Sequence, residues 1–251
     1  MLTELEYKDT AFVTDLVLKR LETEVLDEVR QKLFLEKSTS LQKTIESINA
    51  IENSWEYANA DEAHTYGRKH VGETIKLWSV PEKSAQVLEN LVVLTGAKTI
   101  LEIGTSAGYA ALHLAHGASV TGGTVHTIEL LPEKAHMAQQ NFKASGVKNI
   151  NLIEAEASAV LRDWKYGSID LVFLDADKEN YGKYLEQLVP LMPIGGLIVA
   201  DNINDYGHMM EDYLQKVCGT HLPKTRTDHR VRSYYLAALD NGLLFTKKVA
   251  C

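Results

Sequence analysis

The sequence predicts an α/β fold with a central, mostly parallel sheet and a helical extension at its amino terminus. After Pro81, short apolar runs alternate with helix-like stretches, a pattern typical of βαβ units. The last two runs flank Asp240-Asn241-Gly242, a strong signal for a short antiparallel hairpin. With 251 residues, 45% of them hydrophobic, the chain is long enough to bury a substantial core.

Residues 1–70 are expected to be helical. Between 9 and 35 apolar residues recur at helical spacing, and a second helix is expected over 41–57, after a Ser38-Thr39-Ser40 break that offers N-cap chemistry. This region holds 9 basic and 14 acidic side chains, so it carries -5 of the net charge of -8. We therefore divide the chain into a helical extension, 1–70, and one domain, 71–251.

Seven strands are expected in that domain, the first five parallel and the last two an antiparallel pair. The parallel strands are predicted at 99–103, 124–128, 151–154, 169–174 and 197–200, and the pair at 234–239 and 243–248. Helices are predicted near 108–117, 132–145, 180–192 and 206–218.

Composition excludes several classes of protein. Lys and Arg number 26 against 34 Asp and Glu, which argues against a general nucleic-acid binder. Two cysteines, Cys218 and Cys251, cannot build a disulfide framework or a four-thiolate zinc site, and they fit a reducing compartment. Since neither a signal peptide nor a stretch of ~18 apolar residues is found, we expect a cytoplasmic protein without a membrane partner.

A glycine turn follows the first predicted strand. Gly104-Thr105-Ser106-Ala107-Gly108 leads into a helix, so backbone N–H groups and a helix N-terminus face the space beyond the strand. The only glycines of the turn are Gly104 and Gly108, a spacing that does not match the dinucleotide-binding motif G-x-G-x-x-G and disfavours a dehydrogenase.

The same five residues also satisfy G-x-S-x-G, the nucleophile elbow of serine hydrolases. Ser106 would be the nucleophile, with Asp201 and either His208 or His229 in the required chain order. Only helices precede this turn, however, and no H-G-G-G-type loop lies upstream. A hydrolase is therefore the less favoured alternative.

A nucleoside site is the third interpretation of the turn. Glu129 closes the second predicted strand about 25 residues after Gly104, where a carboxylate can accept both hydroxyls of a ribose. A helix-capping or surface glutamate is the plain alternative for Glu129.

Polar side chains also follow the fourth and fifth predicted strands. Asp175 ends one, and Asp201 with Asn202 ends the next, so parallel pairing would bring these side chains together. Carboxylate and amide oxygens suit Mg²⁺, Mn²⁺ or Ca²⁺ and suit zinc poorly. Lys178, three residues beyond Asp175, is a candidate general base, although a solvated lysine is the commoner case. Isolated aspartates commonly end strands, but the whole set favours a metal site.

Three motifs in this order resemble the cation-dependent O-methyltransferases of the caffeoyl-CoA and catechol type. They are LEIGTSAGY at 101–109, FLDADKENY at 173–181 and GGLIVADN at 195–202. The likeness covers roughly 75–249. It implies a Rossmann-like class I methyltransferase fold, S-adenosylmethionine as methyl donor, a bound Mg²⁺-like ion and a homodimer.

The resemblance also implies roles for individual residues. It assigns the metal to Asp175, Asp201 and Asn202, and the general base to Lys178. It assigns the ribose to Glu129, the methionine end of the donor to Glu102, Gly104 and Thr105, and the adenine to Ala157 and Asp177; Ser79 lines the donor from the preceding segment. Two departures are Ala110, where a serine often binds the methionine carboxylate, and Leu77, where a methionine often lies near the sulfonium.

The sequence therefore predicts divalent-metal-dependent methyl transfer from S-adenosylmethionine to a hydroxyl of a small vicinal dihydroxy aromatic, with a CoA ester as a further acceptor class. A binding or regulatory protein that keeps the donor pocket but does not catalyse is the alternative, motivated by the extra helices, Ala110 and Leu77. His113 and His116 share one helix face without an apparent third ligand, so we interpret them as structural.

Overall fold

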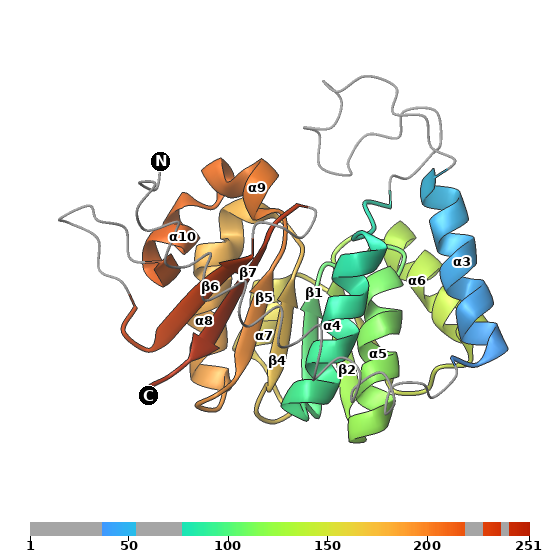
Figure 1. The fold of residues 1–251 in the computed structure, drawn as a ribbon, viewed down its shortest axis with the longest axis horizontal. Helices are drawn as coiled ribbons and strands as arrows, with labels where there is room; N and C mark the ends of the chain where they lie inside the picture. The colour runs from blue at the N-terminus through green and yellow to red at the C-terminus, as the bar shows by residue number, and fades with distance from the viewer. Residues whose placement is uncertain (1–36, 54–76, 219–227, 237–240) are drawn as a thin grey trace.

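The computed structural model describes residues 37–53, 77–218, 228–236 and 241–251, which form helices around one seven-stranded sheet (Figure 1). The strand order is β3-β2-β1-β4-β5-β7-β6. Their bounds are β1 Thr99–Ile103, β2 Thr124–Glu129, β3 Ile150–Glu154, β4 Leu171–Leu174, β5 Leu197–Ala200, β6 Val231–Leu236 and β7 Leu243–Lys248. β1 to β5 pair in parallel, whereas β7 is antiparallel to both β5 and β6. The predicted fold class is confirmed.

Two apolar cores lie on opposite faces of the sheet. One packs the sheet against helices α3 Thr39–Asn53, α4 Glu82–Thr95, α5 Tyr109–Thr121 and α6 Pro132–Ser145. The other packs it against α7 Ala157–Arg162, α8 Tyr181–Leu191 and α10 Glu211–Cys218. Because helices cover both faces, the central strands are almost wholly apolar, as in LVFL of β4.

Helix α3 confirms the described part of the helix predicted over 41–57. Leu41, Ile45 and Ile48 lie in the same core as α4 and α5, and the Ser40 hydroxyl donates to the Ser145 carbonyl at the end of α6 (2.9 Å). Figure 1 shows α3 at the outer edge of the helix layer, beside α6. The helix predicted over 9–35 and the proposed boundary at residue 70 lie outside the described residues, so the division into domains stays a prediction.

The structure differs from the sequence predictions in five places. Helices α4 and α7 were not predicted, and α5 runs to Thr121 rather than to 117. The helix predicted over 206–218 is broken into α9 Ile203–Tyr206, a 3₁₀ turn at Gly207–Met209 (η4), and α10. The first hairpin strand begins at Val231 instead of 234. Arg232 lies near its start, and β6 is an edge strand, where charged side chains are common.

The described helices include none that is both long and apolar enough to cross a bilayer.

Candidate functional site

The turn after β1 depends on a glycine. Gly104 has φ +101°, and a Cβ atom at this position would lie 2.0 Å from the backbone oxygen of Asp175. Only glycine combines this backbone conformation with so close an approach. The end of β1 therefore lies directly against the end of β4.

Ser106 ties this turn to two other segments. Its N–H donates to Glu129 Oε2 (2.8 Å), and its hydroxyl donates to the Leu77 carbonyl before α4. Ser106 also has φ +47°, a strained backbone conformation for a residue other than glycine. No histidine in the described part of the chain hydrogen-bonds Ser106, so the geometry does not support the hydrolase alternative.

Glu129 is a buried carboxylate with a fixed orientation. Besides the Ser106 N–H, it accepts the Leu131 N–H at the start of α6 (2.9 Å) through Oε1. The capping interpretation is thus correct in part. Each oxygen still has a second lone pair, so the same carboxylate can also accept hydroxyl groups of a ligand.

Glu102 on β1 is 0% exposed. The Thr127 hydroxyl donates to its Oε2, while its Oε1 has no hydrogen-bond partner among the described residues. Burial raises the pKa of Glu102 to about 8; the Thr127 hydrogen bond opposes this rise, and the charges of Asp175 and Glu129 add to it. Glu102 is therefore mostly protonated near neutral pH.

Asp175 and Asp201 follow neighbouring strands. Leu174 of β4 pairs with Ala200 of β5, so the next residue of each strand lies at the same edge of the sheet. Asp201 is 1% exposed, and its N–H donates to the Leu174 carbonyl (3.1 Å). Asn202 has φ +66°, which asparagine tolerates better than most residues, and it precedes α9. The strand pairing thus puts the strand ends that carry Asp175 and Asp201 side by side at one edge of the sheet.

Lys178 belongs to a 3₁₀ turn, Lys178–Asn180 (η3), between β4 and α8. Its Nζ lies 2.7 Å from Asp175 Oδ1 and 3.0 Å from the Tyr181 hydroxyl, which itself donates to the Leu174 carbonyl (2.9 Å). The side chain is buried and leans over Asp175, as the spacing predicted.

The chemistry of this donor set fits a hard divalent cation. It consists of two carboxylates and one amide, with open positions for further oxygen ligands. Within the described ranges no group of three or more His, Cys, Asp or Glu side chains is arranged to hold a metal ion. A cation held at these strand ends would therefore need the Asn202 amide as its third protein ligand.

A small pocket joins the turn to the segment before α4. It is lined by five of the predicted site residues, namely Ser79, Gly104, Thr105, Ala110 and Asp175, together with neighbours that include Trp78. Glu102, Glu129, Lys178, Asp201 and Asn202 lie around it without lining it. Ala157 begins α7. The Asp177 carboxylate already accepts the Tyr184 hydroxyl (2.7 Å) and the Asn180 amide.

Lys134 and Glu52, two further residues near this pocket, were not predicted from the sequence. Lys134 lies in the first turn of α6, is 6% exposed, and has its Nζ 4.7 Å from the centroid of the Trp78 ring. Glu52, near the end of α3, accepts the Ser79 N–H through Oε2 (3.4 Å). The sequence offered one signal, which was Lys134 in the first turn of a helix, where the helix dipole disfavours a cation.

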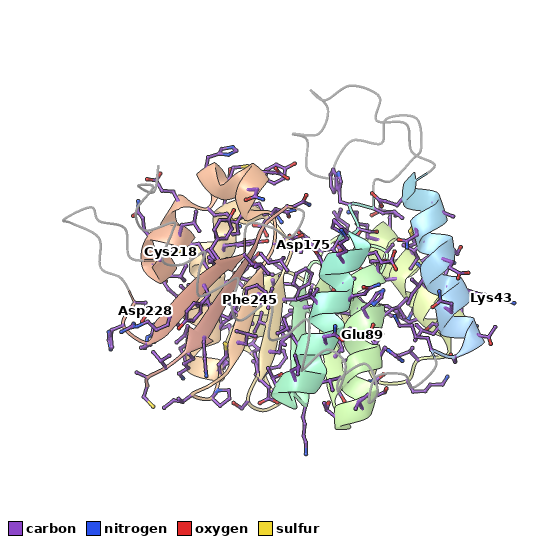
Figure 2. The ribbon with its side chains drawn as sticks, in the orientation of Figure 1. Lys43, Glu89, Asp175, Cys218, Asp228 and Phe245 are labelled. Atoms are coloured by element: carbon purple, nitrogen blue, oxygen red, sulfur yellow. The ribbon has the colours of Figure 1, made fainter. Side chains whose placement is uncertain are left out.

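His113 and His116 occupy a different place. The Nδ1–H of each histidine donates to one oxygen of the Glu89 carboxylate on α4 (2.7 Å each), and Lys37 Nζ lies 3.1 Å from Glu89 Oε2. Burial opposes ionisation of Glu89, but the two histidines and Lys37 outweigh it and lower its pKa. Figure 2 shows Glu89 within the helix layer and Asp175 nearer the upper edge of the view. This geometry supports the structural interpretation of both histidines.

Comparison with known proteins agrees with this geometry. A family model described as O-methyltransferase matches residues 60–249. A catechol O-methyltransferase from Mycobacterium tuberculosis is 38% identical over 124 residues, which are 48% of this chain and 56% of that protein. Caffeoyl-CoA O-methyltransferase 1 from Zea mays is 37% identical over 134 residues, 50% of this chain and 52% of that protein. The chain spans about half the length of these curated relatives.

Solved structures share the fold. An O-methyltransferase from Bacillus cereus in complex with SAH has a TM-score of 0.64 at 22% identity, and covers 89% of this chain and 97% of its own. The O-methyltransferase TomG from Streptomyces achromogenes in complex with SAM has a TM-score of 0.65 at 18% identity, with coverage of 92% and 99%. Since the family model matches most of the sequence, the chain belongs to the O-methyltransferase family.

Proposed function

We propose that the chain transfers the methyl group of S-adenosylmethionine to a hydroxyl of a vicinal dihydroxy aromatic, assisted by a divalent cation such as Mg²⁺, Mn²⁺ or Ca²⁺. One observation carries this proposal. Asp175 and Asp201 follow adjacent strands, beside Lys178, at the edge of the sheet where the Gly104 turn opens. The names of the catechol and caffeoyl-CoA relatives support the acceptor class.

The donor would bind between the glycine turn and the acidic strand ends. We assign the ribose hydroxyls to the remaining lone pairs of Glu129, and the methionine end to Glu102, Gly104 and Thr105. A protonated Glu102 can donate a hydrogen bond where a carboxylate could only accept one. The adenine is assigned to Ala157 and to the acceptor capacity that Asp177 retains.

Asp175, Asp201 and Asn202 would hold the cation. When bound, it would offset the two carboxylate charges and lower the pKa of an acceptor hydroxyl. The buried position of Asp201 excludes competing water from this ligand.

Lys178 moves the proton. In its amine form, Nζ accepts the proton of the acceptor hydroxyl, while the hydrogen bonds to Asp175 and Tyr181 fix its position. The acceptor oxygen then forms a bond to the methyl carbon as the carbon–sulfur bond breaks, and the electron pair stays on a neutral thioether. Because this step cancels charge, positioning by the chain supplies much of the acceleration.

The described basic side chains favour an acceptor without phosphate groups over a CoA ester. Lys216 lies 2.7 Å from carboxylate oxygens of both Glu186 and Asp212, and Arg230 lies 2.6 Å from Asp228. These cations are already neutralised, which leaves them less available for the phosphates of a CoA ester. Residues 219–227 lie outside the described part.

Methyl transfer by the purified full chain tests the proposal. S-adenosylmethionine is supplied with catechol, caffeate or caffeoyl-CoA, first with Mg²⁺, then with a chelator, and then with Mg²⁺ restored. We expect methylated catechol, loss of turnover with the chelator and recovery with Mg²⁺. Turnover that survives chelation would contradict the metal role. Donor binding without turnover over the whole panel would favour the non-catalytic alternative, which the Ala110 departure motivates.

The homodimer and the cytoplasmic location stay predictions. Light scattering on the purified chain tests the first, with twice the 28.0 kDa chain mass expected.

A further inference from the structure

Lys134 is a buried cation with no direct ionic partner among the described residues. It is nine-tenths buried in the first turn of α6, where neither burial nor the helix dipole favours an ammonium group. In the described part of the chain no carboxylate oxygen is found within ion-pair distance of its Nζ, and its recorded contact is the face of Trp78. Such a group indicates that an anion belongs nearby.

The segment that Lys134 contacts, Trp78 and Ser79, offers further hydrogen-bond donors. Trp78 and Ser79 both line the pocket at the glycine turn, and Trp78 has φ +50°, a strained conformation for a bulky residue. The Ser79 Oγ is buried and has no hydrogen-bond partner among the described residues. The Ser79 N–H points to a carboxylate.

That carboxylate comes from the chain itself. Glu52, near the end of α3, accepts the Ser79 N–H at 3.4 Å, longer than an ideal hydrogen bond. Burial lowers the pKa of Lys134, and the charges of Glu129, Asp175 and, least of the three, Glu52 oppose this shift. A carboxylate of α3 thus lies at the Ser79 N–H, and the Lys134 ammonium group lies against the ring of the neighbouring residue, Trp78; we call this place the Lys134 corner.

We propose that Lys134 and Ser79 form a carboxylate subsite, that Glu52 occupies it in the absence of donor, and that the carboxylate of S-adenosylmethionine replaces Glu52. This inference rests on the proposed function. The sulfonium and ammonium groups of the donor suit the acidic side of the site, formed by Glu129 and Asp175. Its single anionic group suits the Lys134 corner. The subsite also explains how a chain with Ala110 in place of serine holds the carboxylate.

Calorimetric titration of the full chain with two ligands tests the subsite. The ligands are S-adenosylmethionine and its decarboxylated form, which differ in the carboxylate alone. Lys134→Met should raise the Kd for S-adenosylmethionine about tenfold or more, and should leave the Kd for the decarboxylated donor within about twofold. Lys143→Met is the matched control, because Lys143 is exposed on the same helix and should change neither Kd.

Glu52→Gln provides a second variant that removes no buried cation. It should lower the Kd for S-adenosylmethionine about twofold or more, because the competing carboxylate is gone, without changing the Kd for the decarboxylated donor. Unchanged or weaker binding of S-adenosylmethionine by Glu52→Gln, or equal effects of Lys134→Met on both ligands, would overturn the subsite. A wild-type chain that binds neither S-adenosylmethionine nor S-adenosylhomocysteine would overturn the proposed function as well.

Discussion

The pKa values of two buried glutamates, Glu89 on α4 and Glu102 on β1, are shifted in opposite directions. Glu89 has both oxygens paired, one with each of two histidines, and Lys37 beside it, so its pKa falls. Glu102 has a hydroxyl on one oxygen and no described partner on the other, and its pKa rises to about 8. A carboxylate satisfied by its own chain stabilises the fold, whereas an under-partnered one beside a pocket is available to a ligand.

The same contrast separates the two regions that contain them. The Glu89 cluster, defined as Lys37, Glu89, His113 and His116, joins the start of the described chain to helices α4 and α5. The strand-end region carries four carboxylates, of which Asp175 forms an ion pair with Lys178. The other three are Glu102, Glu129 and Asp201. We therefore expect changes in the first region to affect stability, and changes in the second to affect activity.

The largest effect is expected at the strand ends. Asp201→Asn should lower the rate of methyl transfer about 100-fold or more, because a buried charged ligand of the proposed cation site is lost. Initial rates with S-adenosylmethionine and catechol at saturating Mg²⁺ measure this effect. The urea midpoint should stay the same or rise, since a buried charge is removed. A normal rate in this variant would remove the distinction between the regions.

Glu89→Gln should lower the stability of the fold and leave the rate of methyl transfer unchanged. The free energy of unfolding should fall by about 3 kcal/mol, because the change removes the carboxylate that accepts hydrogen bonds from two buried histidines and pairs with Lys37. Urea unfolding followed by circular dichroism measures the loss, and kcat per folded molecule should stay unchanged. If stability is unaffected while kcat falls, the Glu89 cluster is not structural.

The pH dependence of stability should also separate the two glutamates. Between the ordinary glutamate pKa of 4.5 and about 8, the folded state binds a proton on Glu102 that the unfolded state has released. Stability from this group therefore falls as pH rises through that window, by at most about 1.4 kcal/mol per pH unit. For Glu89 the folded pKa is the lower one, so its contribution is present above the unfolded pKa of 4.5 and is lost in acid.

Unfolding free energies of wild type and Glu102→Gln, measured from pH 5 to pH 8, isolate the first contribution. The free energy of unfolding of wild type minus that of Glu102→Gln should fall steadily as pH rises. A difference that does not vary with pH would mean that Glu102 ionises as it does in the unfolded chain.

The smallest effect is expected at the rim of the Glu89 cluster. Lys37 is partly exposed, so Lys37→Met should lower the free energy of unfolding by no more than about 1 kcal/mol. Urea unfolding in parallel with Glu89→Gln measures the ratio of the two losses. Equal losses would place the stabilising charge pair at the surface rather than among the histidines.

The fold could be predicted where apolar runs and turn signals coincide. Strands β4 and β5 are wholly apolar, and β1 is largely so, because helices cover both faces of the sheet, and Gly242 marks the hairpin. Helix α7 has only six residues, too few for a helical period to be recognised. The start of β6 was missed because edge strands tolerate charge.

The site could be predicted where it depends on topology alone. Parallel pairing of β4 with β5 brings Asp175 and Asp201 together, and the i to i+3 spacing places Lys178 over Asp175. Lys134 and Glu52 could not be found, because their place depends on how α6 and α3 pack against the segment before α4. For the same reason the sequence showed His113 and His116 as a pair but not Glu89, their partner on another helix.

Binding of Mn²⁺, followed by electron paramagnetic resonance, tests the central claim that the strand ends hold a cation and the Glu89 cluster does not. Wild type, Asp201→Asn and Glu89→Gln are titrated under identical conditions. We predict a stoichiometric site in wild type and in Glu89→Gln, and its loss in Asp201→Asn. Equal binding by wild type and Asp201→Asn, or loss of the site in Glu89→Gln alone, would contradict the account.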